Sequence, residues 1–199
     1  MNLSSGAEDV SFAGEEFDDE ELVGAVFLRC SFRGAGLAGL VTRNCSFQAC
    51  DFTLARLNGS EHDGTDFANS VFEGSNLFGA RFARCRLAGA SFAGATLTGL
   101  LVDGGDWSYA SLRGHDLRGM DLRTVRLHEA DLSEADLTGA DLRGTDFSRA
   151  QLHNAVLADA DLHEANLDGV DLGAAAFRGA RLDLAGAVQL ARSLGAIVE

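Results

Sequence analysis

Apolar and polar residues repeat with a period of five along most of this chain. The pattern is clearest between Ala130 and Ala150, where Ala-Asp-Leu-Ser-Glu is followed without a gap by Ala-Asp-Leu-Thr-Gly, Ala-Asp-Leu-Arg-Gly and Thr-Asp-Phe-Ser-Arg. A period of five fits neither an α-helix nor a flat strand. On a helix the apolar side chain would rotate by about 140° from one repeat to the next, and on a flat strand it would alternate between the two faces. Each unit must therefore turn its own corner, with its small residue and its central Leu or Phe pointing inward.

The unbroken five-residue spacing predicts a continuous solenoid. Each turn of it, called a coil below, contains four repeats. From residue 12 to residue 182 the central position holds Leu or Phe, with four exceptions: Thr42, His62, Val102 and Trp107. Steps of twenty place phenylalanine at residues 12, 32, 52, 72 and 92, whereas steps of fifteen mix residue types at once. Parallel strands about 4.8 Å apart would then make a rod roughly 40 Å long. Most glycines fall at the last position of the unit, where we expect a turn with positive φ.

These units resemble the pentapeptide-repeat family, whose pattern is a small residue, Asp or Asn, Leu or Phe, and two variable positions. The resemblance implies an all-β fold, a right-handed quadrilateral parallel β-helix. The irregular stretch from Leu100 to Tyr109 and the ending from Gly179 to Gly195 are similar to the MfpA and Qnr type, which binds DNA gyrase and protects it from quinolones. The chain lacks the loop insertions of many Qnr proteins and is nearer MfpA.

The expected organisation is an N-terminal tail (1–10), a β-helix (11–182) with no internal boundary, and a C-terminal helix and tail (183–199). The first ten residues hold no apolar core of a secretory signal, and no stretch approaches about 20 consecutive apolar residues. We therefore expect a cytoplasmic protein without membrane contact.

Cysteines and histidines offer little chemistry. All four cysteines stand at the small inward position and are expected to be buried thiols: Cys30, Cys45, Cys50 and Cys85. His62 is expected to be a satisfied core histidine on a locally distorted face, and no histidine has an evident nucleophile or metal partner. With no Gly-rich phosphate loop or catalytic triad either, we expect no enzyme activity, no metal and no cofactor.

Six carboxylates lie between Glu15 and Glu21, and two of them, Glu15 and Glu20, fall at inward positions. We expect the first coil to be frayed there. Two interpretations of this charge stay open. It caps an exposed strand edge, or it forms an acidic patch for a partner.

Aspartates stack in rows from Gly114 onward, one coil apart in each row. The candidate partner-binding residues are Asp116, Asp121, Asp136, Asp141 and Asp161. The alternative is that each Asp only hydrogen-bonds the backbone of its turn, with nearby arginines partly neutralising the rows.

After Leu182 the frame stops, and Asp183 is a good N-cap for a short amphipathic helix. This helix is expected to cover the open end of the coil. Its apolar stripe either plugs this chain's own coil or packs on a second copy, and the family resemblance implies the second, a homodimer. The expected interface residues are Leu184, Ala187, Val188, Leu190, Ala191 and Leu194.

The formal charge is −14, and all sixteen cations are arginine. Such a surface should avoid nucleic acid and favour basic partners. Spread over about 40 Å, this charge is around half as dense as that of DNA. Together with the resemblance, it predicts a DNA mimic that binds DNA gyrase. The alternative is a structural rod that scaffolds other proteins.

Overall fold

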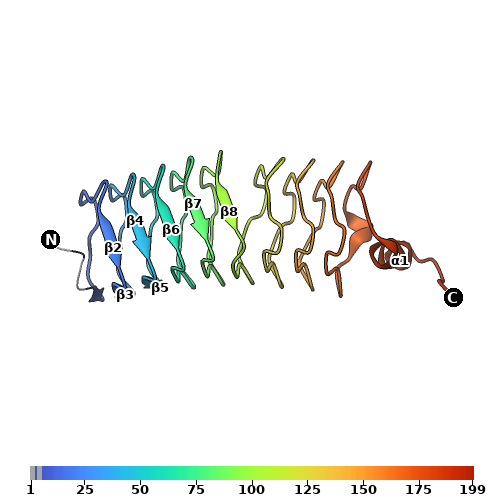
Figure 1. Ribbon diagram of the computed structural model, residues 1–199, viewed down its shortest axis with the longest axis horizontal. Coiled ribbons are helices and arrows are strands. Elements are labelled where there is room, and N and C mark those ends of the chain that lie inside the picture. The colour runs from blue at the N-terminus through green and yellow to red at the C-terminus, as the bar shows by residue number, and fades with distance from the viewer. Residues whose placement is uncertain (1–2, 4–5) are drawn as a thin grey trace. The chain divides into compact units, whose positions relative to one another are not determined.

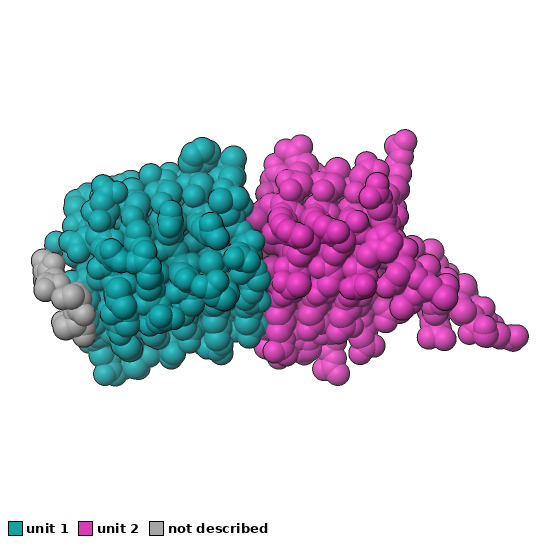
Figure 2. Space-filling view, in the orientation of Figure 1, with its two compact units in different colours: residues 1–106 teal, residues 107–199 magenta. Residues whose placement is uncertain are grey.

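The computed structural model describes residue 3 and residues 6–199, which divide into two compact units, 1–106 and 107–199 (Figure 2). The unbroken frame alone predicts no such boundary. The division falls where the repeat is least regular, since Gly104 and Gly105 adjoin there and Trp107 replaces the usual Leu or Phe.

Among the described residues of unit 1, eight short strands form two parallel sheets. The first sheet has the order β1-β3-β5 and consists of β1 (Ala7–Glu8), β3 (Val26–Leu28) and β5 (Ser46–Gln48). The second has the order β2-β4-β6-β7-β8 and consists of β2 (Glu21–Val23), β4 (Val41–Arg43), β6 (Glu61–Asp63), β7 (Arg81–Ala83) and β8 (Leu101–Asp103). Figure 1 shows the strands of the second sheet one after another along the unit.

The register in both units is twenty residues, as four repeats per coil require. In unit 1 Thr42 pairs with Leu22 on one side and with His62 on the other. In unit 2 single parallel bridges run from Ser111 with Asp131 to Asp161 with Arg181. The predicted quadrilateral parallel β-helix is therefore confirmed within each unit.

The core of unit 1 is a stack of phenylalanine rings. Phe52 lies between Phe32 and Phe72, with ring centroids 5.1 and 4.9 Å apart and interplanar angles of 6° and 5°. Phe47 and Phe67 meet the Phe52 ring edge-on at 5.7 and 5.9 Å. All five rings are at most 1% exposed. In unit 2 the inward positions are filled mainly by leucine and alanine.

The last position of almost every five-residue repeat has a left-handed backbone, as predicted. Gly34 has φ 64°, and Gly119 has φ 65°. Several corners adopt the same conformation without glycine, among them Leu54 at 58° and Tyr109 at 61°. Glycine avoids the cost of about 1–2 kcal/mol that other residues incur there.

The face that carries Thr42 and His62 is regular, so the expected distortion is wrong. The His62 ring is 1% exposed, with Nδ1 2.7 Å from Thr42 Oγ1 and Nε2 2.9 Å from Ser60 Oγ. Because both ring nitrogens have partners, the ring takes the place of an apolar residue inside β6. Burial lowers the pKa of His62 to about 3, which keeps it neutral. The prediction of a satisfied core histidine is confirmed.

The N-terminal expectations need two corrections. β1 pairs with β3, so paired structure begins at Ala7, inside the segment expected to be a tail; residues 1–2 and 4–5 of that segment lie outside the described residues. The first coil is also not frayed, since Glu16 pairs with Gly36. The first coil can be paired although Glu15 and Glu20 stand at inward positions, because both side chains are exposed there.

The C-terminal end of unit 2 contains the 3-10 turn η1 (Leu172–Ala174) and the helix α1 (Leu184–Ser193) (Figure 1). Asp183 is the N-cap of α1, and its Oδ1 accepts a hydrogen bond from the Gly186 N–H at 2.8 Å. Gly186 is buried beside the side chains of Leu167 and Leu182. α1 therefore covers the last coil, as predicted. No described helix has both the length and the apolar character needed to cross a membrane.

Candidate functional site

The aspartate before each central residue closes the corner that follows it. Asp121 Oδ1 accepts a hydrogen bond from the backbone N–H of Arg123 at 3.2 Å. Asp136 Oδ1 accepts one from the N–H of Thr138 at 3.0 Å. Such a contact gives the backbone N–H of the turn a hydrogen-bond acceptor within the same five-residue repeat. These aspartates therefore have a structural role, whatever else their outward carboxylates bind.

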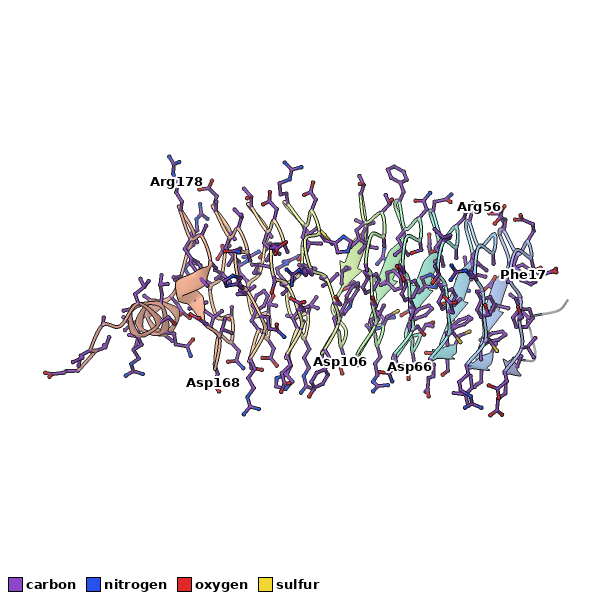
Figure 3. All side chains as sticks on the ribbon, turned by 180° about the vertical axis from the view of Figure 1, so that it is seen from behind. Phe17, Arg56, Asp66, Asp106, Asp168 and Arg178 are labelled. Atoms are coloured by element: carbon purple, nitrogen blue, oxygen red, sulfur yellow. The ribbon has the colours of Figure 1, made fainter. Side chains whose placement is uncertain are left out.

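The structure brings the five predicted aspartates together in two rows of unit 2. Asp116 pairs with Asp136 on one face, and Asp141 lies between Asp121 and Asp161 on the next. Paired strands are about 4.8 Å apart, so the carboxylates of one row are neighbours. Their side-chain exposure ranges from 61% at Asp116 to 25% at Asp161. Other outward side chains of this unit, such as Asp168 and Arg178, project away from the coils (Figure 3).

Arginines bind the first carboxylate of each row through two hydrogen bonds. The Nε and Nη2 atoms of Arg118 donate to Asp116 at 2.8 and 2.5 Å. Those of Arg123 donate to Asp121 at 2.8 and 2.6 Å. The Arg118 guanidinium lowers the pKa of Asp116 to about 2, and Arg123 lowers the pKa of Asp121. Both carboxylates thus stay ionised at neutral pH.

The row of Asp121, Asp141 and Asp161 continues this pattern. Arg143 binds Asp141 at 2.8 and 2.6 Å, and His163 Nδ1 lies 2.6 Å from Asp161 Oδ1. These partners lower the pKa values of Asp141 and Asp161. The row holds three carboxylates but only two guanidiniums, so its net charge is −1 when His163 is neutral. The partial neutralisation expected from the sequence is confirmed.

Comparison with protein families decides what kind of chain this is. A family model described as pentapeptide repeats, in eight copies, matches residues 50–77, 75–100, 108–144 and 145–183. The chain belongs to the pentapeptide-repeat family. A search among proteins of curated function found no match to it.

Solved structures of other pentapeptide-repeat proteins share the fold. QnrB1, a plasmid-mediated fluoroquinolone resistance protein, is 26% identical in a trypsin-treated variant form, with a TM-score of 0.86 over 98% of each chain. Full-length QnrB1 has a TM-score of 0.81 and 26% identity over 96% of this chain and 100% of its own. HetL, involved in heterocyst differentiation in the cyanobacterium Nostoc, is 25% identical, with a TM-score of 0.52 over 88% of this chain and 84% of its own.

The negative charge of this pentapeptide-repeat protein is uneven along the chain. Residues 8–21 carry eight carboxylates and no arginine, whereas residues 22–106 carry seven of each. Unit 2 has fifteen carboxylates and nine arginines. The uniform density used in the comparison with DNA is therefore wrong, because more than half of the net charge belongs to fourteen residues at the start of unit 1.

The predicted interface residues form an incompletely covered apolar surface on α1. Leu184 and Leu194 are 82% and 68% exposed, and Ala187 is exposed as well. Val188, Leu190 and Ala191 are half-buried. A mainly apolar hollow of about 580 Å³ lies between α1 and residues 165–167. In a single chain, the Leu184 and Leu194 side chains of this surface therefore lie largely in solvent.

One histidine has a partner that sequence reasoning missed. His128 Nδ1 lies 2.8 Å from Ser148 Oγ, and His128 Nε2 lies 3.3 Å from Glu129 Oε1. The serine is twenty residues further on, so the coil places it beside the histidine. Arg149 is 3.6 Å from the same Glu129 oxygen. This network gives the polar side chains at an outward corner of unit 2 partners within the chain. None of its members lines the hollow beside α1.

Neither metal ligation nor thiol chemistry has a site among the described residues. In that part of the chain no group of three or more His, Cys, Asp or Glu side chains is placed to hold a metal ion. The four cysteines are buried free thiols, as expected. Burial raises the pKa values of Cys50 and Cys85 to about 12, so neither thiol is a nucleophile at neutral pH.

Proposed function

We propose that this pentapeptide-repeat protein is a non-catalytic, cytoplasmic protein that binds DNA gyrase, inhibiting it, protecting it from fluoroquinolones, or both. The observation that carries the proposal is the likeness to QnrB1 over 98% of both chains. Sharing the repeat does not by itself produce such a close structural similarity. HetL, another pentapeptide-repeat protein, reaches a TM-score of only 0.52 over 88% of this chain.

The aspartate rows of unit 2 are the proposed contact surface. They present outward carboxylates about 4.8 Å apart, and a basic DNA-binding groove could accept them in place of phosphates. Each paired carboxylate must exchange its own guanidinium for a cation of the partner. Such exposed ion pairs are worth about 0–1 kcal/mol each, so the exchange is not costly.

The first prediction concerns the triple variant Asp121→Asn, Asp141→Asn, Asp161→Asn. We expect at least a roughly tenfold loss of gyrase inhibition or drug protection, because about 1.4 kcal/mol of lost charge attraction has that effect. The fold should survive, since an Asn Oδ1 atom can still accept the hydrogen bond of the turn. Supercoiling of relaxed plasmid by purified gyrase, with and without a quinolone, measures both effects.

Arg123→Gln with Arg143→Gln is the matched control for this row. It removes the intramolecular counter-ions and leaves the three carboxylates, so it should act at least as strongly as the unmodified chain. Equal activity of the triple Asn variant would exclude this row as the contact. A folded chain without any effect on gyrase would overturn the proposed function.

A homodimer through α1 is part of the proposal. The exposed Leu184 and Leu194 and the adjoining hollow give a second copy an apolar surface to cover. We expect sedimentation equilibrium to give twice the chain mass, and Leu184→Asp with Leu194→Asp to give a single-chain mass. An unmodified chain that sediments as a monomer at micromolar concentration contradicts the dimer.

The second candidate function is a scaffold for protein–protein interaction without gyrase activity. It is favoured by the ion pairs inside the aspartate rows, which leave the row of Asp121, Asp141 and Asp161 with little net charge. The gyrase assay separates the two functions, because a scaffold changes neither supercoiling nor its response to the drug.

A further inference from the structure

The first coil of unit 1 has an edge that is ready to accept another coil. Its Phe12 and Phe17 N–H groups donate to Ser31 and Gly36 of the second coil, each at 2.7 Å. The carbonyl groups of the first coil equivalent to these two acceptors are those of residues 11 and 16. Neither carbonyl has a hydrogen-bond donor among the described residues. An unpaired edge of this kind is a template for β-sheet extension.

Two carboxylates stand at this edge in columns that are buried everywhere else in unit 1. One and two coils further on, the column of Glu15 holds Ala35 and Ala55, which are 0% exposed. The column of Glu20 continues with Leu40 and Ser60, at most 1% exposed. Glu15 and Glu20 themselves are exposed, because no coil of the described residues lies over them. Of the described residues that precede β1, Leu3 is buried, at 2% exposed.

Three other acidic side chains of the first coil have partners on later coils. Glu16 pairs with Arg56 at 2.6 Å, across Gly36, and Glu21 pairs with Arg43. Asp18 accepts a hydrogen bond from a backbone N–H of the second coil at 2.8 Å. In contrast, no ion pair is formed by Glu15 or Glu20 with any described residue. Stacking would therefore bury two unpaired carboxylates.

We propose that Glu15 and Glu20 prevent a second copy of this chain from stacking on the open N-terminal coil. The second copy is the fitting occupant because it has a square coil of the same size, which could pair with the faces of residues 11 and 16 at once. A single extended peptide could pair with only one of them. Burying an unpaired carboxylate is strongly unfavourable, and stacking would bury two at once.

The test is the full-length double variant Glu15→Ala, Glu20→Ala, which restores the small residue typical of these columns. The matched control is Glu16→Ala, Glu21→Ala, which removes the same charge from outward positions. Light scattering coupled to size exclusion gives the mass of each chain over a range of concentrations. We expect the first variant to reach at least twice the mass of the unmodified protein, and the control to keep its mass.

Three results would overturn the proposal. An unchanged mass of the inward variant would show that the edge is not competent to stack. Equal association of both variants would show that overall charge, and not the inward position, keeps the chains apart. If circular dichroism shows the double variant to be unfolded, the single variants Glu15→Ala and Glu20→Ala carry the test, and unchanged masses of both would contradict it.

Discussion

Phe52→Ala is expected to lower the free energy of unfolding by about 3–5 kcal/mol. The Phe52 ring is stacked between two other phenylalanine rings and is only 1% exposed. Its removal loses the transfer free energy of a buried aromatic side chain and leaves a cavity that a coil fixed by hydrogen bonds on both sides cannot close. Denaturation in guanidinium chloride, followed by far-UV circular dichroism, measures the change.

Phe78→Ala makes the same chemical change at a corner of unit 1, where the ring is 57% exposed. We expect the free energy of unfolding to change by no more than about 0.5 kcal/mol. Similar losses for the two variants would mean that the ring stack does not hold unit 1 together.

Acidification is expected to destabilise the protein through His62, and His62→Leu should remove that part of the pH dependence. Burial lowers the pKa of His62 from 6.5 to about 3 in the folded protein. Between these values the unfolded chain binds a proton that the folded chain does not, so stability falls as the pH falls from about 6.5 to about 3. At about 1.4 kcal/mol per pH unit, the loss between pH 6.5 and pH 4 is about 3 kcal/mol.

The leucine variant leaves no hydroxyl without a partner. Thr42 Oγ1 remains 2.8 Å from Thr65 Oγ1, and Ser60 Oγ still donates to the Leu57 carbonyl at 2.7 Å. Phe82→Leu, in the same column, is the control, since it weakens the core without removing a titratable group. Unfolding midpoints at pH 7, 5.5 and 4 compare the three proteins. If the leucine variant loses stability with acid as steeply as the unmodified chain, His62 is not the cause.

The aspartate rows show how far sequence reasoning reaches toward the site. A row follows from the twenty-residue register, so the neighbours of Asp141 could be named from spacing alone. The arginine two residues after an aspartate is also visible in the sequence, and the pairs of Arg123 and Arg143 confirm the expected neutralisation. Whether these rows bind a partner stays a prediction, because no contact within the chain tests it.

Contacts between coils were harder to foresee. Glu16 reaches Arg56, forty residues away, only because Gly36 between them has no side chain; a Cβ there would lie 1.8 Å from a Glu16 carboxylate oxygen. The hydrogen bond of His128 to Ser148 likewise needs two side chains on separate coils to turn toward each other. Spacing shows that such residues are neighbours, but rotamers and the size of the intervening residue decide whether they bind.

The sequence by itself determined the period, the register, the inward columns and the cap of α1. The first three rest on residue types repeated at fixed short intervals, so each five-residue repeat predicts the same local structure. The cap rests on a single Asp at the point where the repeat stops. Tertiary structure alone decided where the regular coil begins, how the chain divides into two units and which carboxylates lack a counter-ion. These properties depend on what covers each coil and on how long side chains cross between coils. The inward position that is buried at Ala35 and Ala55 is exposed at Glu15 in the first coil, a difference that its place in the repeat does not record.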